Sequence, residues 1–174
     1  MRKDFIMPII ILSLICLFVT GALAVGHNLT QPIIAAAAAE RARLTMREII
    51  PHAEGFEPLD LGGSSPRAVY AAYRTTNDVG YVFIVTPVGY GGYIRILCGI
   101  DPDGRIIRTA ILSHGETPGF GEPVFAESHI SRFWGQNRNG IEGISAITGS
   151  TVTSGAFKSG IRYAFTAFEI VRAQ

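Results

Sequence analysis

The chain begins with a long apolar segment, and apolar and polar residues alternate after it. No Asp, Glu, Lys or Arg occurs between Phe5 and Ala39, and the part from Phe5 to Val25 is almost entirely apolar. A helix rises about 1.5 Å per residue and needs about 20 apolar residues to cross the hydrocarbon of a bilayer. The pattern therefore predicts one N-terminal transmembrane helix over residues 5–25, followed by a water-soluble part.

A cleaved signal peptide is the alternative for this segment. Arg2 and Lys3 provide a basic start, and Ala22-Leu23-Ala24 resembles a cleavage site. The apolar core is longer than the roughly 7–15 residues that a signal peptide uses, so a retained anchor is favoured. Positive charge tends to stay in the cytoplasm, and the far side carries no charge until Glu40. We therefore expect a single-pass protein of the cell (inner) membrane, with a cytoplasmic N-terminus and an extracytoplasmic domain.

A second helical pattern follows the apolar segment. The run from Ala35 to Ile50 consists of strong helix formers and ends before Pro51. Its arginines would contact lipid headgroups or form a solvated helix face, and the second interpretation is the simpler one. Residues 26–64 are accordingly predicted to form a juxtamembrane helix and a linker.

From residue 68 onward the pattern changes to short β-branched and aromatic runs separated by turn residues. The predicted strands cover residues 68–75, 79–87, 92–100 and 105–113. Asp101-Pro102-Asp103-Gly104 forms a hairpin turn by its composition. Consecutive strands with short turns favour an antiparallel meander, and helices come only later, so the fold class is α+β: an antiparallel sheet with flanking helices.

The last predicted element is a helix over residues 155–172. Its apolar residues recur at steps of three and four, which is the spacing of a helix that buries one face. They are Phe157, Ile161, Ala164, Phe165, Phe168 and Val171. Together with the strands, this helix defines a domain over residues 65–174.

Composition narrows the function. Lys plus Arg is 15 and Asp plus Glu is 14, so the clustered positive charge typical of nucleic-acid binding is not expected.

Cys98 is the single thiol of the soluble part, which excludes an internal disulfide there. His114 and Glu116 offer two metal ligands at best, and the other histidines lack zinc-like spacing, so no metal site is predicted.

Two loops contain more Gly, Ser and Thr than packing requires, namely residues 114–121 (HGETPGFG) and 148–154 (TGSTVTS). The hydroxyls of the second loop precede the last helix, and Thr153 or Ser154 would cap its N-terminus. The same position also suits a phosphate, because free N–H groups and the positive helix end attract anions. Both interpretations stay open from this loop alone.

Hydrolase motifs do not fit these loops. The chain has no G-x-S-x-G, and Ser154 and Lys158 are four residues apart where S-x-x-K requires three. An anchored serine hydrolase that uses Ser150 or Ser154 is an unsupported alternative. A further alternative is an anchored domain without redox chemistry, in which both loops are purely structural.

The two loops together resemble a known family. HGETPGFG is similar to the H-x-E-T-P-G-L-G loop, and TGSTVTS to the (S/T)-G-A-T-x-T-S motif, of the covalent FMN domain in the flavin-carrying subunit of Rnf electron-transport complexes, which is designated G. The equivalent subunit of the sodium-pumping NADH:quinone reductase, designated C, shares that domain. Gly89-Tyr90-Gly91-Gly92 and the turn at Asp101 resemble the family's glycine-rich hairpin and G-x-D turn. The resemblance covers roughly residues 65–172.

The resemblance implies that Thr151 carries FMN through a phosphoester, which a separate flavin transferase makes. It assigns the surroundings of the phosphate and the isoalloxazine to further residues by motif position. Thr148, Gly149 and Thr153 would surround the phosphate, and His114, Glu116, Thr117 and Gly119 would border the ring. Ser150, Tyr90 and Gly91 are the other predicted cofactor-binding residues. In three places the chain differs from the motifs: Ser150 stands where the family has Ala, Ser145 where it usually has Asp, and Phe120 where it usually has Leu.

The function implied by the resemblance is electron relay through covalent FMN, within an ion-translocating complex that works between ferredoxin and NAD. The subunit would have no catalytic residue of its own, since the flavin supplies the redox chemistry. Its partners would be the other subunits of the complex, the flavin transferase and the lipid bilayer. The nearest alternative is the equivalent subunit of the quinone reductase.

Overall fold

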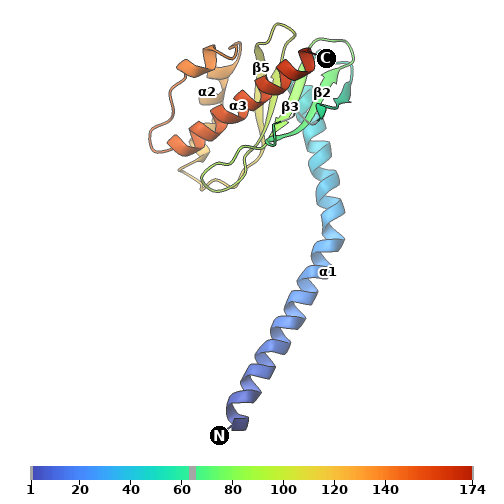
Figure 1. Ribbon diagram of the computed structural model, residues 1–174, viewed down its shortest axis with the longest axis vertical. Coiled ribbons are helices and arrows are strands. Elements are labelled where there is room, and N and C mark those ends of the chain that lie inside the picture. The colour runs from blue at the N-terminus through green and yellow to red at the C-terminus, as the bar shows by residue number, and fades with distance from the viewer. Residues whose placement is uncertain (1, 63–65, 174) are drawn as a thin grey trace. The chain divides into compact units, whose positions relative to one another are not determined.

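The computed structural model describes residues 2–62 and 66–173 and contains one long helix followed by an α+β domain (Figure 1). The chain divides into two compact units, Met1–Arg41 and Ala42–Gln174. The second unit contains both loops singled out in the sequence. Its architecture therefore determines how the candidate site is built.

The long helix, α1 (Arg2–Ile49), joins the two helical segments expected from the sequence into one. Pro32 lies inside it and is tolerated between good helix formers, at the loss of one backbone hydrogen bond. The side chains from Ile6 to Val25 are exposed, and the helix is apolar and long enough to cross a membrane. Its end at Ile49, just before Pro51, agrees with the prediction.

The sheet has five strands in the order β1-β2-β3-β4-β5, and every neighbouring pair is antiparallel. This confirms the predicted meander and the α+β class. The turn from β4 to β5 is closed by hydrogen bonds from Asp101 N to Arg105 O (2.8 Å) and from Gly104 N to Asp101 O (3.0 Å). The strands are β1 (Phe56–Leu59), which the sequence did not predict, β2 (Val69–Thr75), β3 (Tyr81–Val85), β4 (Arg95–Ile100) and β5 (Ile106–Ser113).

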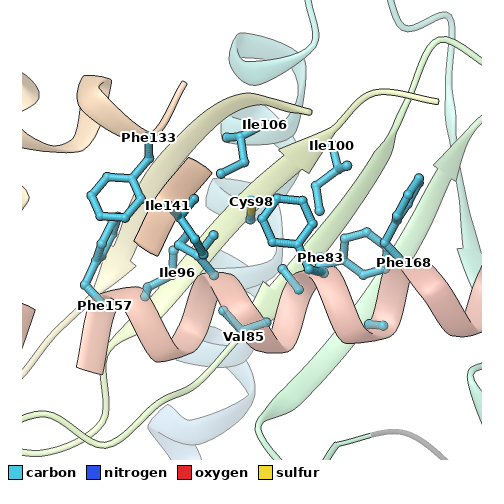
Figure 2. Packing of buried hydrophobic residues seen from close by; sticks show 14 of the residues in the cluster. Phe83, Val85, Ile96, Cys98, Ile100, Ile106, Phe133, Ile141, Phe157 and Phe168 are labelled. Atoms are coloured by element: carbon cyan, nitrogen blue, oxygen red, sulfur yellow. The ribbon is translucent and has the colours of Figure 1, made fainter. Parts of the chain in front are cut away.

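One face of the sheet packs against the C-terminal helix, α3 (Thr151–Arg172), which crosses this face (Figure 1). Phe157 and Phe168 of this helix belong to the same buried cluster as Phe83 and Ile96 of the sheet (Figure 2). Helix and sheet approach closely at Gly160, where a Cβ atom would lie 2.8 Å from Ile96 Cδ1. The periodicity of the last helix therefore predicted its buried face correctly.

The opposite face of the sheet is covered by the last two turns of α1. Met46 and Ile49 pack with Val82, Ile84 and other buried residues of the sheet in a second apolar cluster. These turns belong to the second compact unit, which begins at Ala42. The sequence identified this helix but not its packing partner.

The segment between β5 and α3 folds into short helical turns that complete the core. Their buried side chains include Val124, Ile130, Phe133 and Ile141. The turns are η2 (Glu122–Phe125), α2 (Glu127–Ile130), η3 (Ser131–Phe133) and η4 (Gly140–Gly143).

The start of α3 differs from the prediction by four residues, because the helix begins at Thr151 and not at residue 155. Ser150 is the N-cap residue, and Ser154 N donates to Ser150 O at 2.8 Å as the first helical bond. Ser and Thr have modest helix propensity, so the helical pattern of the sequence is weak at the first residues of α3. Thr151 is thus part of the helix and not a residue that precedes it.

Candidate functional site

A cavity of about 450 Å³ lies where the two glycine-containing loops meet the start of α3. This volume falls within the roughly 300–1,000 Å³ typical of small-molecule sites. Seven of the predicted site residues line it: Tyr90, Glu116, Thr117, Gly149, Ser150, Thr151 and Thr153. Residues from three distant parts of the sequence therefore converge on one pocket.

Thr151 occupies a distinctive position in this cavity. It is the first residue of α3, its side chain is exposed, and it also borders a second cavity of about 300 Å³. Gly149 precedes it with a φ of +84°, a conformation that glycine adopts without strain. The chain thus turns sharply into the helix and leaves the Thr151 hydroxyl accessible.

The hydroxyls around Thr151 do not cap the helix. Thr153 Oγ1 donates to Glu116 Oε2 at 2.8 Å, and Ser154 Oγ accepts a bond from Ile147 N at 3.1 Å. The N-cap Ser150 makes no side-chain capping bond, and its hydroxyl donates to Phe120 O. The capping interpretation of this loop is therefore wrong, and the first N–H groups of the helix, which have no intrahelical partner, face no capping side chain within the described part of the chain.

Loop 114–121 forms the opposite wall of the cavity. Thr117 O accepts bonds from Phe120 N and Gly121 N, both at 3.2 Å, and Gly119 adopts a φ of +80° within this turn. Phe120 is 70% exposed and lines the cavity, where the family usually has Leu. This aromatic ring serves the pocket and not the core.

Four of the predicted residues lie outside the residues that line the cavity. His114 is exposed, and its ring lies 4.6 Å from that of Phe125 at the beginning of the loop. Gly91 is connected to the cavity through Glu116, since its N–H donates to Glu116 Oε1 at 3.2 Å. Thr148 and Gly119 are exposed neighbours of lining residues.

Three of the lining residues, Phe120, Gly121 and Val152, were not among the predicted site residues. Phe120 and Val152 are exposed apolar side chains, and Tyr90 beside them is 77% exposed. Apolar walls of this kind suit a flat aromatic ligand. Their position inside the two motifs was the available signal, but the motifs alone did not show which side chains point into the cavity.

A serine-hydrolase mechanism gains no support from the geometry. The hydroxyls of Ser150 and Ser154 are buried and engaged with the backbone. Over residues 2–62 and 66–173 no group of three or more His, Cys, Asp or Glu could hold a metal ion.

His129 in α2 borders the second cavity and packs against Phe133 with ring centroids 5.8 Å apart. Burial lowers the pKa of His129, and the positive charge of Arg132 lowers it further. The unfolded chain then binds a proton at this histidine more readily than the folded chain. The contribution of His129 to the free energy of unfolding is therefore fully present above the pKa of the unfolded chain, about 6.5, and is lost as the pH falls below it.

We therefore expect the midpoint of thermal unfolding of the full chain in detergent to decrease between about pH 7.5 and about pH 5.5. The variant His129→Gln should show a shallower pH dependence, because it removes the titrating group. An equally steep dependence in the variant would assign the effect to other groups. The comparison uses the slope with pH, so a uniform loss of stability in the variant does not affect it.

Comparison with known proteins agrees with this geometry. Residues 89–166 match the FMN-binding domain family, and this range contains the glycine hairpin, both loops and most of α3. The chain is similar to the G-designated component of the proton-translocating ferredoxin:NAD(+) oxidoreductase complex of Clostridium ljungdahlii, with 29% identity over 163 residues, 88% of this chain and 85% of that protein.

Two further relatives, both with the same designation, extend the similarity. The one from the Na(+)-translocating ferredoxin:NAD(+) oxidoreductase complex of Acetobacterium woodii is 27% identical over 185 residues, covering 92% of this chain and 89% of the relative. The one from the ion-translocating oxidoreductase complex of Methanosarcina acetivorans is 28% identical over 186 residues, covering 99% and 97%. The similarity therefore includes the N-terminal helix as well as the domain.

Proposed function

We propose that this chain relays electrons through FMN within an ion-translocating oxidoreductase complex, because residues 89–166 match the FMN-binding domain family and the relatives are named as components of such complexes. The observation that carries the proposal is the cavity of about 450 Å³ that the exposed Thr151 lines. The names of the relatives from Clostridium ljungdahlii and Acetobacterium woodii, both from ferredoxin:NAD(+) oxidoreductase complexes, favour this function over the quinone-reductase alternative. Bound FMN supplies the redox chemistry, and the chain supplies position and electrostatics.

The residues of the cavity fit FMN in their chemistry. The start of α3 offers N–H groups and a positive helix end to a phosphate, with Thr148 and Gly149 beside it. Tyr90 and Phe120 offer exposed aromatic surface to the isoalloxazine ring. Among the described residues that line this cavity there is no lysine or arginine, so the phosphate would be held by the backbone and by hydroxyl groups.

Covalent attachment through Thr151 is part of this proposal. The Thr151 oxygen would form a bond to the phosphorus of the FMN part of a flavin dinucleotide. The bond from this phosphorus to the second phosphate would break, a nucleoside monophosphate would leave, and the threonine proton would pass to solvent. A separate flavin transferase would catalyse this reaction. An FMN anchored in this way stays with the protein even though the site opens to solvent.

We also propose the placement of the chain in the membrane. Residues 5–25 would cross the bilayer, residues 26–64 would form the juxtamembrane helix and linker, and residues 65–174 would form the FMN domain. Arg2 and Lys3 favour a cytoplasmic N-terminus, so the domain would be extracytoplasmic. Other membrane and peripheral subunits of the complex would be its partners.

The test is to produce the full chain in membranes together with a flavin transferase and to examine it after denaturation. We expect flavin absorbance that stays with the denatured protein, and the mass of one FMN on the peptide that contains Thr151. Flavin that is released by denaturation would support FMN binding but contradict covalent attachment. Protein without any flavin, made beside an active transferase, would contradict the proposed function.

A further inference from the structure

The carboxylate of Glu116 lies buried where the glycine hairpin, loop 114–121 and α3 meet. The residue is 5% exposed, and each carboxylate oxygen accepts a hydrogen bond from a different segment. Oε1 accepts from Gly91 N at 3.2 Å, and Oε2 accepts from Thr153 Oγ1 at 2.8 Å. A buried carboxylate is costly unless it is hydrogen-bonded in this way, so the two bonds make Glu116 a junction of three segments.

Two glycines create the space for this carboxylate. A Cβ atom at Gly89 would overlap Glu116 Oε1, and one at Gly121 would lie 2.7 Å from Glu116 Cβ. Any side chain at either position would displace the carboxylate. Gly89 and Gly121 are therefore explained by the close approach of their backbones to Glu116.

The bond to Thr153 fixes the direction of the first turn of α3. Residues two apart in an α-helix are separated by about 200° around its axis, so they point in nearly opposite directions. Thr153 is 2% exposed and points inward to Glu116, whereas Thr151 is exposed at the cavity. A helix held at Thr153 consequently presents Thr151 outward in one orientation.

We propose that Glu116 is a positioning residue that orients Thr151 for the attachment of FMN and does not itself contact the flavin. The proposal rests on the proposed function, because it concerns the same site. Through Gly91 the same carboxylate holds the glycine hairpin, and with it Tyr90, against the cavity. The inference assigns Thr153 to this junction and not to the phosphate.

Glutamine provides a sharp test of this role. Its carbonyl oxygen accepts from Gly91 N, and its amide donates to the Thr153 hydroxyl, which accepts as well as donates. Glu116→Gln therefore keeps both connections and removes only the charge. Glu116→Ala removes both connections and leaves the Gly91 N–H and the Thr153 hydroxyl without their partner.

The experiment follows the FMN-modified fraction of the Thr151 peptide over time, by mass spectrometry, in full chains made together with a flavin transferase. We expect Glu116→Ala to slow modification by about 10- to 100-fold, the scale on which misplacement of a reacting group slows a reaction. Glu116→Gln should stay within about threefold of wild type, since both hydrogen bonds persist. Thr153→Val should resemble Glu116→Ala, whereas Thr153→Ser should resemble wild type.

The double variant Glu116→Ala/Thr153→Val separates positioning from two independent effects. If both residues act through their shared hydrogen bond, the double variant is no slower than the slower single variant. Multiplied effects in the double variant would overturn the proposal. A folded Glu116→Gln chain that is modified as slowly as Glu116→Ala would also overturn it, because a role for the charge itself would then be required.

Folding is checked separately, on unmodified chains made without the transferase, by thermal unfolding. If Glu116→Ala does not fold, Thr153→Val and Glu116→Gln still decide the question. A folded Thr153→Val or Glu116→Ala chain modified at the wild-type rate overturns the positioning role and leaves the proposed function intact. A wild-type chain that carries no flavin, either covalent or bound, contradicts the proposed function itself, so the two failures are distinguishable.

Discussion

Replacement of Thr151 by alanine is expected to abolish covalent flavin while the domain stays folded. Thr151 is exposed, no hydrogen bond from its side chain to the described part of the chain holds the fold, and alanine is a better helix former at this position. The alanine side chain has no oxygen to which the phosphorus of FMN could bond. The measurement is the intact mass of the full chain after expression with a flavin transferase, combined with peptide mapping.

Two variants serve as controls for this result. Thr151→Ser keeps the hydroxyl at the same helical position and should remain modified. Thr166→Ala removes a hydroxyl from the same helix at a residue that does not line the cavity, and Thr151 should still carry FMN. If Thr151→Ala retained one covalent FMN, the attachment site would lie elsewhere, with Thr148 and Thr153 as the next residues to examine.

Phe157→Ala is expected to produce a large loss of stability in the domain. Phe157 is fully buried, and its ring forms an edge-to-face pair with Phe133 at a centroid distance of 5.0 Å (Figure 2). Removing a buried Phe side chain costs about 3–5 kcal/mol through lost transfer energy and the cavity that remains. We expect a correspondingly lower temperature midpoint of unfolding of the full chain in detergent. The measurement is near-UV circular dichroism during thermal unfolding.

Tyr163→Ala is the matched control for this prediction, because Tyr163 lies on the exposed side of the same helix. Its effect should be below about 1 kcal/mol, as for most surface substitutions. A Phe157→Ala variant that unfolds at the wild-type midpoint would mean that α3 is not packed on the sheet as described.

Much of the fold follows from local sequence signals. The strands around Phe83 and Ile96 lie in β-branched runs bounded by turn residues, and the apolar stripe through Phe157 and Phe168 fixes the buried face of α3. These signals act over a few residues, so they are visible without tertiary information. Strand β1 was missed because it is only four residues long and contains Pro58.

The start of α3 shows where local signals fail. Thr151, Thr153 and Ser154 are residues that favour caps and turns, yet they form the first helical turn. What holds them there is tertiary, since the Thr153 hydroxyl bonds to Glu116, 37 positions earlier in the chain. Propensity alone could not provide that contact.

The candidate site also has a part that local sequence signals predict and a part that depends on tertiary contacts. Its motifs identified Thr151 and both loops, because each motif is contiguous in the sequence. The junction at Glu116 depends on bonds to Gly91 and Thr153, which lie 25 residues before and 37 residues after it. The sequence therefore located the site but not the side chain that connects its parts.

The cover that the last turns of α1 provide for the sheet has a practical consequence for cutting the domain from its anchor. A fragment that starts at residue 65 lacks Met46 and Ile49, and Val82, Ile84 and Leu97 would then face water. An exposed apolar surface of this kind promotes aggregation. A fragment that starts at Ala42 keeps its own apolar cover, so the natural place to sever this protein lies inside a continuous helix and not in the loop that follows it.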